Sequence, residues 1–417
     1  MTVRLRTWTA VLAIVAVVVA ACSSGTTEPS ATSGAAEPAD YSGRGPYAVG
    51  VLELALDPDH PVLVFYPVDP AGVAEGSEPY TYSGGDIFEP AIADILPGAL
   101  AGEVAPPDTW VGLPASPDGP FPVVLHSHGA SGAYRFAGLH NSHTASWGNV
   151  VVAVDHPERG LVAAIASIGG GGDDGPVDRF LDTDQLLAGL DLVVAEGETA
   201  GSPIEGAVDG DRVAGEGHSA GGSASGAAAY DPRISAWIAQ ASGGAADPGV
   251  DLDPYLSEAT AEGPASFDRE AYRAENPAPP VPAMLLAAEG DTVVELDGVV
   301  ATYDWLTTTP KVLGVIADSG HAVFVDPCVP IRDTGGLSAF VAALGIDPNS
   351  VGLIRLGEDG CLPEDVDPAA VQAVVDHMTV AFLQSVFGDA AVGLASLDAA
   401  YLDSLFPGLL ERVDVQR

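Results

Sequence analysis

Apolar runs of strand length recur along this chain and are separated by segments with helical spacing. The runs are short, rich in Val, Ile and Leu, and continuous, which is typical of strands buried on both faces of a sheet. We expect strands at residues 62–67, 122–132 with its terminal loop, 149–157, 208–216, 234–241, 281–288 and 311–316. Helices are expected at residues 133–148, 179–196, 222–229 and 367–387. Because strands alternate with helices, the pattern predicts an α/β fold with a mostly parallel central sheet flanked by helices.

The remaining polar segments predict insertions within one large domain. Residues 69–120 are dense in Pro, Gly and acidic side chains, so they are expected to form a long loop region with one short helix near residues 87–96. The chain has 417 residues and no internal repeat, and α/β sheets of this size commonly form a single domain. We therefore predict one domain over residues 42–417.

The N-terminus has the pattern of an export signal. Arg4 and Arg6 precede an apolar run at residues 11–21, and Cys22 follows it. Residues 19–22 resemble the lipobox of bacterial lipoproteins, which implies cleavage before Cys22, lipidation of that cysteine and a cell-envelope location facing the extracytoplasmic side. An ordinary cleaved signal or a retained anchor is the alternative. Residues 22–41 are then expected to be a flexible tether, because they carry little apolar surface.

The other two cysteines are expected to form a disulfide. Cys328 and Cys361 are an even pair in a chain with an export signal, and such pairs are usually bridged outside the cytoplasm. Two buried free thiols are the alternative. A bridge at Cys328 would also restrain the segment around His321, seven residues earlier.

The charge balance limits the kinds of ligand that the protein is expected to bind. Fifteen Lys and Arg stand against 58 Asp and Glu, for a formal net charge of −43. Such a surface repels nucleic acid and other polyanions. We interpret it as a solvated acidic surface, and we expect neutral or zwitterionic small-molecule substrates in preference to anionic ones.

One pentapeptide has the spacing of a nucleophile elbow: Gly217, His218, Ser219, Ala220 and Gly221. In such an elbow a strand turns sharply into a helix with the serine at the apex, and crowding requires small residues two positions before and two after it. The predicted strand before this motif and the small-residue helix after it provide that context. Ser219 is therefore interpreted as a nucleophile, with a buried turn serine as the alternative.

Asp291 and His321 follow Ser219 in the order that this elbow requires. Each comes just after a predicted strand, and strand ends of a parallel sheet share one edge, so the three side chains are expected to meet. The predicted roles are nucleophile for Ser219, general base for His321 and orienting carboxylate for Asp291. Three other acids lie near enough in sequence to compete for the last role, namely Glu289, Asp297 and Asp318.

The oxyanion of the reaction needs two N–H donors. The candidates are the backbone N–H of Ala220, next after the nucleophile, and that of Ala130, after His128 and Gly129. No metal or cofactor is expected. Two histidine pairs, His126 with His128 and His140 with His143, lack the acidic or cysteine partners of a recognisable zinc set.

The motifs together resemble one branch of the α/β-hydrolases, which holds platelet-activating-factor acetylhydrolases, dienelactone-hydrolase-like proteins and bacterial polyester hydrolases. The resemblance covers residues 45–390 and is carried by Tyr66-Pro67, Ser127-His128-Gly129, Val154-Asp155-His156, residues 217–222, Asp231-Pro232-Arg233-Ile234, Gly290-Asp291 and Gly320-His321. It implies an α/β-hydrolase fold and a cofactor-free carboxylesterase or lipase-like activity. Dienelactone hydrolases proper use a cysteine nucleophile, whereas this chain has Ser219. The segments 69–120 and 332–367 exceed those expected in the compact polyester hydrolases.

The sequence thus predicts an envelope-anchored serine hydrolase of short-chain or phospholipid-type esters. Two alternatives stay open. One is a hydrolase of polymeric or wax-like esters. The other is a surface lipoprotein that binds a ligand without catalysis.

Overall fold

A computed structural model describes residues 36–87, 102–168, 180–257, 267–333, 335–343 and 354–417 of this protein. Residues 36–417 form one compact unit. The expected signal segment, Cys22 and most of the expected tether lie outside the described residues, as does nearly all of the helix expected near residues 87–96.

The compact unit is built on a ten-stranded sheet, in the order β10-β9-β8-β7-β6-β4-β5-β2-β1-β3. The strands are β1 (Ala48–Asp57), β2 (His60–Val68), β3 (Thr109–Val111), β4 (Phe121–Ser127), β5 (Val150–Val154), β6 (Val208–His218), β7 (Ile234–Gln240), β8 (Ala283–Ala288), β9 (Lys311–Ile316) and β10 (Leu410–Gln416). Strands β4 to β9 pair in parallel, whereas β2 pairs antiparallel with β1 and β5, and β10 pairs antiparallel with β9. The predicted mostly parallel sheet is confirmed.

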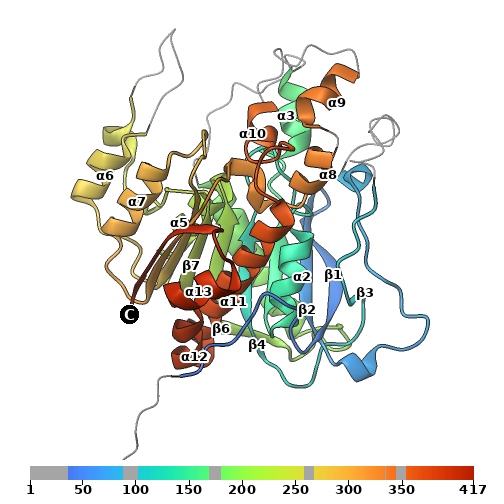
Figure 1. Ribbon diagram of the computed structural model, residues 1–417. Helices are drawn as coiled ribbons and strands as arrows, with labels where there is room; N and C mark the ends of the chain where they lie inside the picture. Colours follow the sequence, from blue (N-terminus) through green and yellow to red (C-terminus); the bar gives the residue numbers. More distant parts are fainter. Residues whose placement is uncertain (1–35, 88–101, 169–179, 258–266, 334, 344–353) are drawn as a thin grey trace, which may run out of the picture. The chain divides into compact units, whose positions relative to one another are not determined.

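Helices cover both faces of this sheet (Figure 1). One apolar cluster joins α2 (Gly138–Ser146) and α11 (Pro368–Phe387) to one face, and a second joins α4 (Leu181–Gly197), α5 (Ala220–Ala228) and α7 (Leu296–Trp305) to the other. The central strands β4, β5, β8 and β9 are buried at every residue. Their continuous apolar sequences are therefore explained by burial on both faces.

Further elements were not expected from the sequence. They include strand β1, the edge strands β3 and β10, and the helices α3 (Leu161–Ile168), α6 (Arg269–Glu275), α8 (Cys328–Asp333), α9 (Leu337–Ala343), α10 (Ile354–Glu358), α12 (Ala390–Ser396) and α13 (Ala399–Leu405). Helices α8, α9 and α10 lie near α3 at one end of the sheet (Figure 1). Helices α9 and α10 belong to the segment 332–367 that the sequence marked as unusually long, and α8 ends at its start.

Helix α11 begins as the sequence predicts, because the Asp367 side chain accepts a hydrogen bond from the Ala369 N–H and Pro368 occupies the first turn. By length and composition alone it could cross a membrane, and it is the one such helix among the described residues. However, 67% of its apolar window is buried inside the compact unit, as in the core helix of a globular domain.

The compact unit begins earlier than the expected boundary at residue 42. The Ala39 N–H donates to the Ser396 hydroxyl over 2.8 Å, and the Tyr41 N–H donates to His377 Nδ1 over 3.1 Å. Tyr41 is buried, with its ring edge-on to Trp147. One aromatic side chain therefore anchors the end of a segment whose composition is otherwise that of a tether.

Candidate active site

The sharp strand-to-helix turn expected at Ser219 is present between β6 and α5. Ser219 lies at the turn with φ 55° and ψ −118°, a conformation that non-glycine residues rarely adopt. A Cβ on Gly217 would lie 2.3 Å from the Gly221 carbonyl carbon, and a Cβ on Gly221 would lie 1.9 Å from the Ser127 carbonyl oxygen. Backbone contact thus explains why both flanking positions are glycine, as the sequence predicted.

The structure brings Ser219, His321 and Asp291 together in one hydrogen-bonded row. The Ser219 hydroxyl lies 2.9 Å from His321 Nε2, and His321 Nδ1 donates to Asp291 Oδ2 over 2.8 Å. The imidazole is 3% exposed, so this row is shielded from bulk water on the histidine side. An imidazole held between a hydroxyl and a carboxylate can remove the hydroxyl proton while the carboxylate stabilises the resulting imidazolium.

Asp291, and none of its three rivals, is the acid that contacts His321. It follows β8, while His321 follows β9, so parallel pairing of these strands brings the two loops side by side. The N–H groups of Val293 and Val294 donate to Asp291 Oδ1 over 2.8 and 2.7 Å, which leaves Oδ2 for the histidine. Two backbone donors therefore fix the direction in which this carboxylate points.

The loop after β4 packs directly against the elbow. A Cβ on Gly129 would lie 2.7 Å from His218 Nδ1 and 3.3 Å from Ser219 Cβ, so this loop approaches the nucleophile as closely as backbone allows. Ala130 follows Gly129 in that loop, and Ala220 is the first residue of α5. Both proposed oxyanion donors thus belong to segments that adjoin Ser219, and their role as donors stays a prediction.

A half-buried arginine that the sequence analysis did not identify holds this loop in place. The Arg159 guanidinium donates to the His128 carbonyl, to the Ser127 hydroxyl over 2.9 Å and to the Asp182 carboxylate. The backbone carbonyl of Arg159 also accepts from the Ser131 N–H over 2.8 Å. Nothing local in the sequence marks Arg159 for this role, because it acts on residues about thirty positions earlier.

A second missed residue is the histidine inside the elbow. His218 Nε2 donates to the His321 carbonyl over 2.9 Å, and the two rings lie 4.8 Å apart between centroids. Burial, and secondly the neighbouring His321, lower the pKa of His218 well below its usual value. His218 is therefore a neutral donor that fixes the backbone of His321. The sequence feature that could have pointed to this role is the position of His218 directly before Ser219 in the pentapeptide 217–221.

Two hollows lie beside this row of residues, one lined by His321 and the other by Ser219. A cavity of about 170 Å³ lies beside His321 and Ala130, and its walls are mostly apolar. These walls include Phe136, Leu161, Phe324, Val325, Ile331, Leu337 and Leu356. A wider cleft of about 800 Å³ is lined by Ser219 and Ala220, together with serines, glycines and the loop after Asp291. A substrate atom at Ser219 can therefore carry one group into an apolar pocket and another into an open cleft.

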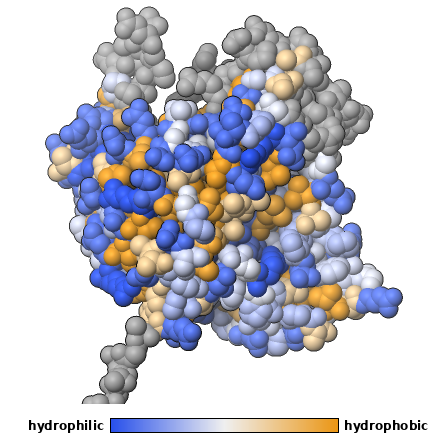
Figure 2. All heavy atoms as spheres, viewed as in Figure 1, coloured by the Kyte–Doolittle hydropathy of each residue, from blue (hydrophilic) through white to orange (hydrophobic). Residues whose placement is uncertain are grey.

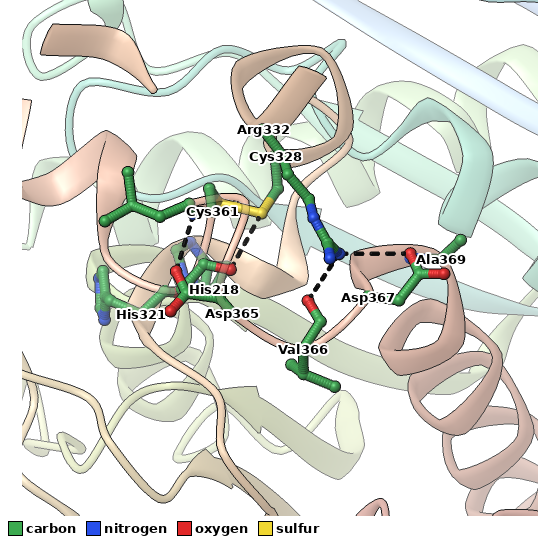
Figure 3. Close-up of a disulfide and its surroundings, with 11 residues drawn as sticks. His218, His321, Cys328, Arg332, Cys361, Asp365, Val366, Asp367 and Ala369 are labelled. Atoms are coloured by element: carbon green, nitrogen blue, oxygen red, sulfur yellow. Dashed lines mark hydrogen bonds and ion pairs between the residues drawn. A yellow bond between two sulfur atoms is a disulfide. The ribbon is translucent and has the colours of Figure 1, made fainter. Parts of the chain in front are cut away.

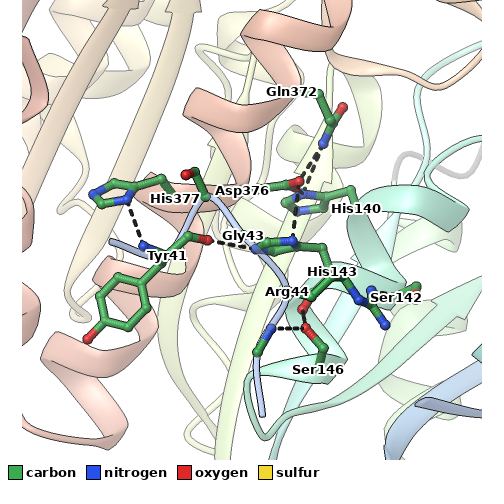
Figure 4. A network of polar contacts seen from close by, with 12 residues as sticks. Tyr41, Gly43, Arg44, His140, Ser142, His143, Ser146, Gln372, Asp376 and His377 are labelled. Atoms are coloured by element: carbon green, nitrogen blue, oxygen red, sulfur yellow. Dashed lines mark hydrogen bonds and ion pairs between the residues drawn. The ribbon is translucent and has the colours of Figure 1, made fainter. Parts of the chain in front are cut away.

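The two histidine pairs lie in buried contacts with acids. His140, on α2, is bonded through Nε2 to Glu216 at 2.9 Å. Its Nδ1 is bonded to Asp376 at 2.7 Å (Figure 4). Burial by itself lowers the pKa of His140, but the Glu216 charge and the hydrogen bonds to both carboxylates raise it to about 10. Among the described residues, no group of three or more His, Cys, Asp or Glu side chains is arranged to hold a metal ion.

No protein-family model matches this chain, and no curated protein matches its sequence. The case for a function therefore depends on the chain's own residues and their geometry.

Proposed function

We propose that this protein is a serine carboxylic-ester hydrolase with an α/β-hydrolase fold and an acyl-enzyme mechanism. The observation that carries the proposal is the hydrogen-bonded row of Ser219, His321 and Asp291. The chain order of these three residues and the elbow around Ser219 are those of α/β-hydrolases. The sequence resemblance to the branch with platelet-activating-factor acetylhydrolases supports the same assignment.

In the first half-reaction, Ser219 Oγ attacks the ester carbonyl carbon while His321 Nε2 accepts the hydroxyl proton. The tetrahedral intermediate then collapses, the bond to the alcohol oxygen breaks, and His321 gives its proton to that oxygen. In the second half-reaction, water attacks the acyl-serine with His321 again as the base. The carboxylic acid leaves and the proton returns to Ser219. Asp291 stabilises the imidazolium in both halves.

The oxyanion of each tetrahedral intermediate is proposed to accept hydrogen bonds from the N–H groups of Ala130 and Ala220. The closeness of Gly129 to Ser219 supports Ala130 as a donor, because Ala130 is the next residue of the same loop. Arg159 and His128 then act as supports of this loop. No cofactor enters this chemistry.

Neutral or zwitterionic esters with apolar groups are the proposed substrates. Within the described residues, four large apolar side chains are exposed, and three of them, Val162, Val293 and Val329, lie on α3, on the loop after Asp291 and on α8. Figure 2 shows apolar residues gathered in the middle of the viewed face with hydrophilic ones around them. Exposed apolar side chains on a strongly acidic protein favour neutral or zwitterionic esters, of short-chain or phospholipid type, over esters that carry a net negative charge.

The cell envelope is the proposed location, with the chain anchored through a lipid on Cys22. The basic and apolar pattern of residues 4–21 supports export. The Cys328–Cys361 disulfide also supports it, because such bonds persist in oxidising compartments. The membrane would then be a partner only through the lipid.

A polymeric or wax-like ester is the second candidate substrate, and the wide cleft beside Ser219 favours it. A third reading, a binding lipoprotein without catalysis, predicts no covalent reactivity at Ser219.

A fluorophosphonate probe tests the proposal. We expect stoichiometric labelling of the native protein, loss of labelling in Ser219→Ala, and unchanged labelling in the control Ser404→Ala, an exposed serine on α13. An ester panel graded by chain length then separates small from polymeric substrates. A folded protein that neither labels nor hydrolyses any ester would favour the binding lipoprotein.

A further inference from the structure

Asp359 connects the loop that bears Asp291 with the loop that bears His321. It lies after α10, far from both loops in sequence, and its carboxylate is half-buried. Asp359 Oδ2 accepts two hydrogen bonds from Thr292, from the backbone N–H over 2.8 Å and from the hydroxyl over 3.0 Å. Thr292 is the residue next to Asp291.

The backbone of Asp359 contacts the other loop. Its carbonyl accepts from the Ala322 N–H over 2.8 Å, and Ala322 is next to His321. On the other side of His321, a Cβ on Gly320 would lie 2.5 Å from Asp359 Oδ1 and 2.5 Å from the Gly360 nitrogen. Gly320 therefore permits a contact that any larger residue would block.

A disulfide holds this segment. Cys361, two residues after Asp359, is bonded to Cys328 at the start of α8, with 5.1 Å between their Cα atoms. Figure 3 shows the disulfide beside His218 and His321. The Cys361 N–H also donates to the Glu358 carbonyl over 2.8 Å, which closes a tight turn around Asp359. The disulfide and this turn thus fix the position of Asp359 independently of its contacts with the two loops.

We propose that Asp359 is a positioning residue that sets the alignment between the Asp291 carboxylate and the His321 imidazole. This inference rests on the proposed hydrolase function. A direct backbone bond, from the Gly290 N–H to the Ser319 carbonyl at 2.8 Å, joins the two loops on one side of Asp291. Asp359 joins them on the other side, through Thr292 and Ala322. Small misalignments there are costly, since about 1 Å of displacement can lower a rate by about a hundredfold.

The test compares Asp359→Ala and Asp359→Asn with Asp365→Ala as the matched control. Asp365 lies in the same segment and caps the Leu362 N–H, without a hydrogen bond to either loop in the described residues. In Asp359→Ala we expect kcat per fluorophosphonate-reactive site to fall about 10- to 100-fold, with KM changed less than about threefold. Asp359→Asn keeps an oxygen acceptor for Thr292 and should recover most of the rate.

Two further measurements exclude a merely structural role. The acidic limb of the kcat/KM profile, which reports the free enzyme's base, should move to lower pH in Asp359→Ala because a misaligned Asp291 stabilises the imidazolium less. The far-downfield proton signal of the His321–Asp291 hydrogen bond should weaken in the same variant. Loss of folded protein alone would lower the number of labelled sites and move neither readout.

The hydroxyl of Thr292 provides a milder variant if Asp359→Ala does not fold. Thr292→Val removes one of the two bonds to Asp359 and should lower kcat in the same direction, and it should have no further effect when added to Asp359→Ala. An unchanged kcat per labelled site and an unchanged acidic limb in these variants would overturn the role of Asp359 alone. A wild-type protein without labelling or hydrolysis would overturn this inference together with the proposed function.

Discussion

At the scale of single residues, Ser219 shows how local backbone strain and packing mark a reactive side chain. Its positive φ is maintained because Gly217 and Gly221 allow the strand, the turn and the β4 carbonyl to come into contact. Strained positions of this kind persist only where the surroundings determine them, and they cluster at functional sites. The hydroxyl is thereby held 2.9 Å from the nitrogen that would activate it.

Asp291→Asn tests the orienting role at this scale. The amide can occupy the same space, but it can present an N–H where His321 needs an acceptor, so the imidazole takes the wrong tautomer. We expect kcat to fall about 10⁴-fold with little change in stability. Steady-state kinetics on a soluble ester would measure this. Asp297→Asn, on α7, is the control and should change kcat less than about threefold; equal losses in the two variants would contradict the assignment of Asp291.

The buried pair of Glu216 and His140 gives a prediction about stability. Both carboxylate contacts of His140 require a protonated ring, and the folded-state pKa of about 10 lies above the value of about 6.5 in an unfolded chain. The raised pKa of His140 therefore contributes stability that is fully present below about pH 6.5 and is lost as the pH rises through about 10. Chemical denaturation across this range should show a falling free energy of unfolding.

The variant His140→Gln extends this test, because it leaves Glu216 buried without its cation. We expect a loss of about 3–5 kcal/mol in the free energy of unfolding near neutral pH. A His140→Gln/Glu216→Gln double variant should be less destabilised and should lose much of the alkaline slope. If the double variant keeps the wild-type slope, the pH dependence arises elsewhere.

At the scale of elements, the segment containing α8, α9 and α10 forms one wall of the apolar cavity and supports the His321 loop. The sequence identified the pair Cys328 and Cys361, and the disulfide is confirmed. The sequence also predicted that this bridge would restrain the segment around His321, but it did not identify the contacts that connect the two. That became visible only when α10 was placed against Gly320, because the contacts join residues 30 to 70 positions apart.

Removing the disulfide should therefore lower the free energy of unfolding. The bridge spans 33 residues, so a Cys328→Ser/Cys361→Ser double variant is expected to lose about 3–4 kcal/mol of unfolding free energy. Denaturation of the variant and of the native protein, each with and without reductant, would measure the loss. Reductant should destabilise the native protein and leave the variant unchanged; an equal effect on both would contradict this explanation.

At the scale of the whole molecule, the net charge of −43 is the dominant property. Repulsion among like charges opposes compactness, and salt screens it. We expect the Tm to rise as sodium chloride is increased from about 0.05 M to about 1 M. A non-ionic osmolyte at matched osmolarity is the control. A Tm that rises equally with both solutes would indicate surface exclusion in place of charge screening.

The sequence by itself determined the alternation of buried strands and helices, the nucleophile elbow and the cysteine pair, because each is written in local pattern and spacing. It also named Asp291 and His321 through their positions after strands. Only the tertiary structure excluded the rival acids, paired the strands β1 and β10, and placed Arg159, His218 and Asp359 around Ser219, His321 and Asp291. Those contacts depend on which distant backbones pack together, and hydrophobic periodicity along one segment carries no information about its neighbours in space.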